Sequence, residues 1–233
     1  MISNNISSKA MLIHHHQQTG QVNVTSHDVL AVQGGKGFTL GAGRAFSDHD
    51  KRALVELLLN EHSQIEYVPN NLVVRGRGCL VWYVAPQLID IPFPDKTIKA
   101  PLPGLIFCAF EGMPLRCYAF KGNNRPEAST PLFYAPLGNV YEDGDFCTGN
   151  VKLPEEVLVQ NIPTWERFVL ESTNTHIGTV NPIKGCENFQ GMIAFYQQLA
   201  ESKARRFPAK SLVPFRHRGA HLTLDTVVQE SQQ

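Results

Sequence analysis

Residues 105–120 read LIFCAFEGMPLRCYAF, and this stretch decides the fold class. Two apolar runs, at residues 105–110 and 115–120, flank the sequence Glu-Gly-Met-Pro at residues 111–114. Glycine and proline between two apolar runs are typical of a tight turn. The stretch therefore predicts an antiparallel β-hairpin.

Further strands are predicted on both sides of this hairpin. Residues 72–74 and 79–84 form two apolar runs around an Arg-Gly-Arg-Gly turn, and Pro86 stops the second run. Residues 132–134 predict another short strand, and the valine-rich residues 21–32 predict one near the N-terminus.

Three segments have apolar residues at helical spacing. The first begins after Ser47, a good N-cap, and runs to about Glu61. The others cover residues 163–170 and 188–200, and a further helix is expected to begin at residues 155–159. Because helices follow a run of strands instead of alternating with them, the predicted class is α+β.

Both ends of the chain are polar and are expected to be poorly ordered, up to about residue 20 and from about residue 223. The three histidines at residues 14–16 are interpreted as part of a flexible segment and not as a metal-binding tract. The predicted organisation is an N-terminal extension or small α/β subdomain at residues 1–70, a main domain at 71–205 and a C-terminal tail at 206–233.

The composition excludes several classes of function. The 233 residues carry 21 basic and 21 acidic side chains, so no net charge favours binding to nucleic acid or to an anionic membrane surface. No apolar run approaches the ~18 residues of a membrane-spanning helix, and no signal peptide is recognised. The glycine-rich residues 34–43 lack the pattern of a phosphate-binding loop.

The five cysteines form no CxxC pair, which argues against a zinc ribbon or a thioredoxin-like motif. Free thiols and a reducing, cytoplasmic location are expected. The cysteines are Cys79, Cys108, Cys117, Cys147 and Cys186.

Residues 134–149 read YAPLGNVYEDGDFCTG and have no regular periodicity. Asn139 precedes Cys147 by eight residues, and Gly144 lies five residues after Asn139. These intervals resemble those of ubiquitin-conjugating enzymes, in which an asparagine after the last strand precedes a glycine and the active-site cysteine. The His-Pro that comes before this asparagine in that family is Leu137-Gly138 here.

The chain more closely resembles the PRTRC system protein B family of bacterial ubiquitin-conjugating-enzyme-like (UBC-like) proteins. The resemblance covers about residues 72–200 and implies a UBC-like fold, an antiparallel β-meander followed by an irregular active-site segment and C-terminal helices. The matching pieces are Trp82-Tyr83 before Pro86, Arg125-Pro126, Asn139-Val140, the run from Gly144 through Cys147 to Gly149, and Thr175-His176.

The resemblance implies that Cys147 is the nucleophile that carries a thioester, because acyl transfer needs an accessible thiol. It implies that Asn139 stabilises the oxyanion formed when an amine attacks the thioester. His176 is either a general base or a structural hydrogen-bonding residue. Other candidates for helping to deprotonate the amine are Tyr141, Glu142, Asp143 and Asp145.

The resemblance implies three kinds of partner: a ThiF-like adenylating enzyme, a β-grasp ubiquitin-like protein and a JAB-type isopeptidase. No cofactor and no metal are expected. The main alternative is a non-catalytic UBC-like scaffold that binds the ubiquitin-like protein or the adenylating enzyme. A cysteine hydrolase built on Cys147 and His176 is a third hypothesis, and a metal site formed by these two residues with Cys186 lacks a recognisable ligand spacing.

Overall fold

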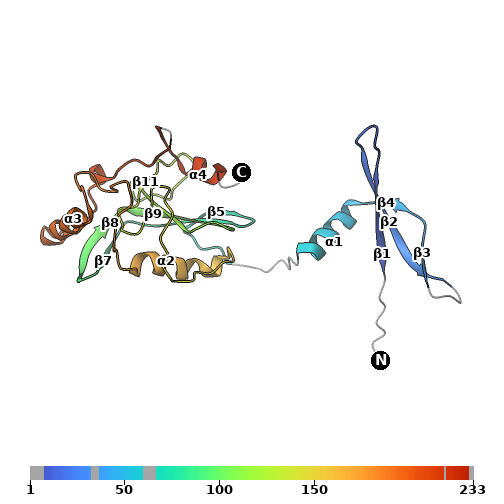
Figure 1. Cartoon of the computed structure of the whole chain (residues 1–233), viewed down its shortest axis with the longest axis horizontal. Coiled ribbons are helices and arrows are strands. Elements are labelled where there is room, and N and C mark those ends of the chain that lie inside the picture. Colours follow the sequence, from blue (N-terminus) through green and yellow to red (C-terminus); the bar gives the residue numbers. More distant parts are fainter. Residues whose placement is uncertain (1–7, 33–36, 60–66, 218, 231–233) are drawn as a thin grey trace, which may run out of the picture. The chain divides into compact units, whose positions relative to one another are not determined.

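The computed structural model describes residues 8–32, 37–59, 67–217 and 219–230 (Figure 1). It divides the chain into two compact units, Met1–Glu66 and Tyr67–Gln233. The N-terminal unit contains β1 (Lys9–His15), β2 (Val22–Ala31), β3 (Phe38–Leu40), β4 (Arg44–Ala45) and α1 (Asp48–Leu59).

Strand β2 is the centre of the N-terminal unit, since β1, β3 and β4 all pair with it antiparallel. The predicted strand at residues 21–32 is confirmed. Helix α1 begins as predicted after Ser47, whose Oγ accepts from the Asp50 amide at 3.2 Å while the Ser47 amide donates to Asp50 Oδ2 at 2.9 Å. This reciprocal pair satisfies amide groups that the first helical turn leaves free.

The expectation of a poorly ordered N-terminal segment is wrong for residues 9–15, which form β1; residues 1–7 lie outside the described residues. Ile13 pairs with Val24, and His15 pairs with Val22. The polar residues around a short apolar group argued against a strand, but β2 supplies a backbone partner for each position of β1.

The C-terminal unit is built on a five-stranded antiparallel sheet with the strand order β11-β10-β9-β6-β5. The two predicted hairpins are confirmed as β5–β6 and β9–β10, and the predicted strand at 132–134 is confirmed as β11. The sheet's strands are β5 (Leu72–Gly76), β6 (Cys79–Val84), β9 (Gly104–Phe110), β10 (Arg116–Phe120) and β11 (Phe133–Tyr134).

A further hairpin, β7 (Gln87–Phe93) with β8 (Lys96–Leu102), is inserted between β6 and β9 and was not predicted. Pro92 and Pro101 lie within its strands, paired with Thr97 and Leu88, although prolines in a sequence argue against a strand. A two-stranded ladder leaves one edge of each strand unpaired, so a proline without an amide hydrogen is tolerated there.

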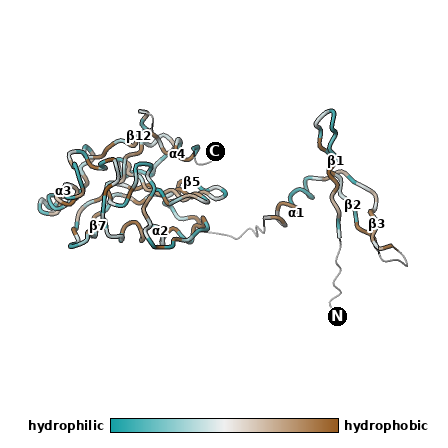
Figure 2. Tube along the Cα trace, in the orientation of Figure 1, coloured by the Kyte–Doolittle hydropathy of each residue, from teal (hydrophilic) through white to brown (hydrophobic). Residues whose placement is uncertain are grey.

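Both faces of the five-stranded sheet are buried. Alternate residues of β6, such as Leu80 and Trp82, join a cluster under α2 (Ile162–Glu171) and α3 (Phe189–Glu201). The intervening residues of the strands join a second cluster under α4 (Leu224–Glu230), which lies on the opposite side of the sheet from α2 (Figure 1). The central strands are accordingly hydrophobic along most of their length (Figure 2).

Trp82 anchors the first cluster. Its ring is fully buried and stacks between Phe107 at 5.4 Å and Trp165 of α2 at 5.5 Å. The helices predicted at residues 163–170 and 188–200 are confirmed as α2 and α3. The helix expected from residue 155 is not formed; a short 3-10 turn at Val159–Asn161 leads directly into α2.

The C-terminal segment is also more ordered than expected. After a 3-10 turn at Ala209–Ser211 and the short pair β12 (Arg216–His217) and β13 (Ala220–His221), α4 buries Leu224, Val227 and Val228. These three residues lie on one face of a helix, a pattern too short for periodicity to reveal in a polar stretch. The α+β class with antiparallel sheets is confirmed, and no helix within the described residues is long and apolar enough to cross a membrane.

Leu224→Ala is expected to lower the free energy of unfolding by about 2–5 kcal/mol, because removal of a buried leucine side chain leaves a cavity. Leu224 is 1% exposed and lies under the sheet. The control is Leu88→Ala, since Leu88 is 50% exposed. Its loss should change stability by about 0.5 kcal/mol or less, as is usual at the surface. Urea denaturation measures both, and equal midpoints for the two variants would contradict the packing of α4.

Candidate active site

Cys147 ends a short β-hairpin formed by residues 139–147, here called the active-site hairpin. Val140 and Phe146 face each other across an antiparallel bridge. The Cys147 amide donates to the carbonyl of Asn139 at 2.7 Å, and the Tyr141 amide donates to the carbonyl of Asp145 at 2.9 Å. The stretch that looks irregular in the sequence therefore has regular backbone pairing. This pairing places Asn139 and Cys147 opposite each other.

The active-site hairpin is bound to the edge of β10. The Phe146 amide donates to the carbonyl of Leu115 at 2.8 Å, and the Cys117 amide donates to the carbonyl of Gly144 at 2.9 Å. Between these bonds, Arg116 Nε donates to Asp145 Oδ1 at 2.8 Å, and both side chains are mostly buried. Nothing in the sequence pointed to Arg116, whose partner lies 29 positions away.

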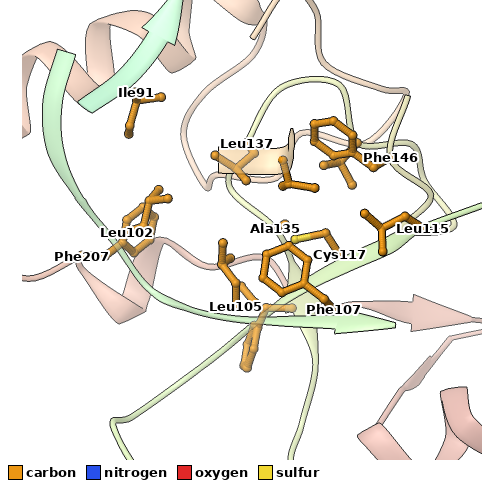
Figure 3. Close-up of a cluster of buried hydrophobic side chains, with 14 of the residues drawn as sticks. Ile91, Leu102, Leu105, Phe107, Leu115, Cys117, Ala135, Leu137, Phe146 and Phe207 are labelled. Atoms are coloured by element: carbon orange, nitrogen blue, oxygen red, sulfur yellow. The ribbon is translucent and has the colours of Figure 1, made fainter. Parts of the chain in front are cut away.

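Phe146, the residue directly before Cys147, is anchored in the core. Its side chain is 3% exposed and lies with Leu137 and Leu115 in the first cluster (Figure 3). Its ring meets that of Phe168 of α2 edge-on at 5.5 Å. Cys147 therefore follows a fixed residue, although it is itself partly exposed.

Gly144 allows the hairpin to turn against the sheet. Its φ is +89°, and a Cβ there would lie 2.4 Å from a ring carbon of Tyr118. Tyr118 cannot give way, because it is 1% exposed and its hydroxyl donates to the carbonyl of Asp143 at 3.1 Å. Burial raises the pKa of Tyr118 well above its ordinary value, so this hydroxyl stays protonated and available as a donor.

Asn139 joins the base of the hairpin to the segment 173–176. Its φ is +62° and its side chain is almost completely buried. Asparagine tolerates this left-handed conformation better than most residues do. Its Nδ2 donates to the carbonyl of Thr173 at 2.8 Å. Its Oδ1 accepts from the amide and the hydroxyl of Thr175 at 3.1 and 2.8 Å, and its own amide donates to the carbonyl of His176 at 2.9 Å.

Gly138 explains the departure from the His-Pro of ubiquitin-conjugating enzymes. A Cβ at this position would lie 2.8 Å from the Cβ of Asn174 and 2.9 Å from the carbonyl oxygen of His176. The Gly138 amide donates to Asn174 Oδ1 at 2.5 Å, a bond that proline cannot form. Residues 173–176 lie so close to position 138 that glycine is required there, directly before Asn139.

Cys147 is the accessible thiol among the chain's five cysteines. It is partly exposed, whereas Cys79, Cys108, Cys117 and Cys186 are buried. Burial raises the pKa of each of these four thiols, which disfavours the reactive thiolate.

Tyr141 lies near both Cys147 and His176. The Cys147 side chain is the main influence that raises the pKa of Tyr141, acting through a hydrogen bond and through charge. The rings of Tyr141 and His176 lie 6.1 Å apart, and Tyr141 is 44% exposed. The structure thus brings Cys147, Asn139, Tyr141 and His176 together.

The acidic candidates are held by other contacts. Asp145 pairs with Arg116; burial raises its pKa, and the guanidinium opposes that shift. Asp143 Oδ1 accepts from the Asp145 amide at 3.0 Å, and Glu142 accepts from the hydroxyl of Thr179. Glu142 and Asp143 line a pocket of 540 Å³ at the tip of the hairpin, and Cys147 does not line it.

Residues 50–215 match the family model described as prokaryotic E2 family D. The chain belongs to prokaryotic E2 family D. This membership confirms the resemblance to bacterial ubiquitin-conjugating-enzyme-like proteins and gives the chain a role related to ubiquitin-like conjugation, with ubiquitin-like proteins and activating enzymes as its general partners. No curated protein and no solved structure matches the chain.

Gly144→Ala in this E2 family D protein is expected to lower the free energy of unfolding by about 1–3 kcal/mol more than Gly112→Ala. Both glycines have positive φ, but a Cβ at Gly112 meets no atom within 4 Å. The difference between the variants therefore isolates the clash with Tyr118. Urea denaturation measures it, and equal losses of stability would show that the hairpin does not press on the sheet.

Proposed function

We propose that Cys147 accepts the C-terminus of a ubiquitin-like protein as a thioester and passes it to an amine. The observation that carries the proposal is that this thiol is the accessible one of five and lies at the base of a hairpin fixed to the sheet. A carrier thiol must meet two protein partners in turn, so it needs an exposed position with a rigid backbone beneath it.

The transfer step generates an oxyanion, for which Asn139 is the proposed donor. One hydrogen of its Nδ2 is bound to the carbonyl of Thr173, and an amide nitrogen carries a second hydrogen. The carbonyl of Asn139 accepts from the Cys147 amide at 2.7 Å, which keeps the two residues in register. A preorganised donor beside the nucleophile stabilises charge that develops only in the transition state.

The resemblance to the PRTRC system protein B family supports a more specific set of partners. A ThiF-like adenylating enzyme would supply a β-grasp ubiquitin-like protein, and a JAB-type isopeptidase would cleave the conjugate. The reaction needs Cys147 in its reduced form, which fits a cytoplasmic location.

Incubation with ATP, an adenylating enzyme and its ubiquitin-like protein is expected to give a covalent adduct that thiol reductant cleaves. The adduct should be absent in Cys147→Ala and present in Cys186→Ala, because Cys186 is a buried thiol. Non-reducing gels and intact mass measure it.

The same experiment tests the alternative of a non-catalytic scaffold. If the adenylating enzyme charges itself but Cys147 forms no adduct, the carrier function is contradicted. Binding of the ubiquitin-like protein without an adduct would then favour the scaffold.

Asn139→Gly is expected to retain formation of the thioester and to slow its discharge onto an amine by about 100-fold, the usual loss for one oxyanion donor. Glycine is the substitution of choice because it tolerates the positive φ at this position. Single-turnover discharge of the purified thioester onto free lysine measures the effect. An unchanged discharge rate would remove Asn139 from the chemistry and leave it a structural role.

A further inference from the structure

The cavity of 540 Å³ at the tip of the active-site hairpin lies on the face of the sheet that α4 covers. Its lining includes three aromatic residues, Tyr118, Tyr134 and Phe215. Phe215 packs edge-on against both tyrosines, at 4.8 and 5.0 Å. Cavities of about 300–1,000 Å³ with apolar walls and a few polar groups are typical of sites for small ligands. Neither Cys147 nor His176 lines this cavity, so it is separate from the candidate active site.

Tyr134 presents a hydroxyl without a partner to this cavity. The residue is 8% exposed, and its hydroxyl has no hydrogen-bond partner among the residues that the structure describes. The hydroxyl of Tyr118, by contrast, donates to the carbonyl of Asp143. Burial and then the charge of Glu142 raise the pKa of Tyr134, so its hydroxyl stays protonated and lies near that carboxylate. Because buried polar groups are normally hydrogen-bonded, this hydroxyl indicates that a ligand supplies its partner.

Three carboxylates line the cavity from two elements. Glu142 and Asp143 come from the tip of the hairpin, and Glu230 is the last residue of α4. Glu142 binds Thr179 through Oε2, and Asp143 binds the Asp145 amide through Oδ1, so each keeps one oxygen without a donor in the described chain. Glu230 forms no hydrogen bond or ion pair with any described residue. Its charge does not stabilise the helix either, because a carboxylate at the C-terminal end opposes the helix dipole.

The arginines of the lining do not cancel this charge. Arg116 is paired with Asp145, which does not line the cavity. Arg216 donates to the carbonyl of Gly219 at 2.8 Å and is the one cation that opposes the three carboxylates among the described lining residues. A cation beside aromatic rings is also attracted to the negative charge of the ring faces. The lining therefore favours a positively charged ligand with an apolar body.

The arrangement of the carboxylates favours an organic cation over a metal ion. No three acidic, histidine or cysteine side chains of the described residues lie close enough together to hold a metal. A linear aliphatic amine reaches carboxylates that lie apart, because each of its ammonium groups carries its own hydrogen-bond donors. Its methylene groups are able to cover the aromatic residues between them.

We propose that this cavity binds an aliphatic chain with two or more ammonium groups, either a free polyamine or adjacent lysine side chains of a peptide. Glu142 and Asp143 bind one ammonium group and Glu230 binds another, while the Tyr134 hydroxyl accepts a hydrogen bond from the ligand. The proposal does not rest on the carrier function of Cys147, and it stands or fails by binding alone.

Spermidine is the first probe. It is titrated into the full-length protein and followed by aromatic ¹H–¹³C correlation, with the Tyr134 signals assigned by Tyr134→Phe. We expect saturable shifts of the Tyr134 ring signals. The compound 1,8-octanediol has a chain of similar length without charge, and it is expected to leave these signals unchanged. Equal shifts with the two compounds would overturn the preference for a cation.

The acetylated and amidated dipeptide Lys-Lys is the second probe, and it distinguishes the two sources of the ligand. Both probes carry the same chemistry. Tighter binding of spermidine would assign the cavity to a free polyamine, and tighter binding of the dipeptide would assign it to a basic peptide segment. If neither probe shifts the Tyr134 signals, the proposal is overturned.

Glu230→Gln is expected to weaken binding of the tighter probe by about tenfold, as is usual for the loss of a charged hydrogen-bond partner. The matched control is Glu201→Gln, since Glu201 is the exposed last residue of α3 and does not line the cavity. Calorimetric titration at physiological ionic strength measures both affinities. Equal affinities of the two variants would show attraction to surface charge in general and would contradict a site in the cavity.

Tyr134→Phe tests the hydroxyl alone, because the ring is kept. Its binding should be about fivefold weaker, the usual effect of one hydrogen bond, while its unfolding midpoint in urea stays unchanged. The control is Tyr83→Phe, since Tyr83 does not line the cavity. An unchanged affinity in Tyr134→Phe would exclude the hydroxyl from the site. A loss of stability would show that the hydroxyl serves the fold and would remove this support for a ligand.

Discussion

The outer edge of β10 is the constraint on which the candidate site depends. One edge of this strand pairs with β9, and the other is divided between β11 and the active-site hairpin. The hairpin bonds to the backbone of Leu115 and Cys117 there. Backbone groups left unpaired in a buried setting are costly, so breaking these bonds carries a penalty of about 1–3 kcal/mol for each group. The position of Cys147 is thus set by the sheet, although the sequence around it looks like a loop.

The second buried face of the sheet extends this constraint to the C-terminal segment. Phe215 packs edge-on against Tyr118 at 4.8 Å and against Tyr134 at 5.0 Å. Tyr118 is the residue that bonds to the carbonyl of Asp143 and lies against Gly144. Phe215, beyond residue 206, therefore packs against the same tyrosine that contacts the active-site hairpin. Tyr118 belongs both to the core and to the support of the candidate site.

The sequence predicted correctly those elements whose local residue pattern is sufficient to define them. The hairpin at residues 105–120, the helices at 163–170 and 188–200, and the α+β class follow from periodicity and turn residues. Hairpin β7–β8 was missed because prolines count against a strand unless its edge is known to be free. Strand β1 was missed because its sequence is largely polar and its pairing with the neighbouring strand β2 supplies its backbone partners, whereas helix α4 was missed because it packs on core residues distant in sequence.

The same limit applies to the site. Spacing alone relates Asn139 to Cys147, and resemblance adds His176, but neither predicts the hairpin that places them together. The sequence could not identify Thr173 as a contact of Asn139, because Thr173 accepts the hydrogen bond with its backbone carbonyl, a group that every residue has. The sequence does not identify Arg116 either, because its ion pair with Asp145 depends on the pairing of β10 with the hairpin.

The carboxylates of the hairpin and the imidazole of His176 are held by contacts at opposite ends of the hairpin. Asp145 is paired with Arg116, and Asp143 and Glu142 accept hydrogen bonds at the tip of the hairpin. Burial raises the pKa of Asp145 and the Arg116 guanidinium opposes that shift, so the two effects together set how readily this carboxyl takes up a proton. His176 Nδ1 lies 3.0 Å from the hydroxyl of Thr175, and that hydroxyl also contacts Asn139 Oδ1 at 2.8 Å. The acids thus hold the tip of the hairpin, while Thr175 and His176 hold its base at Asn139.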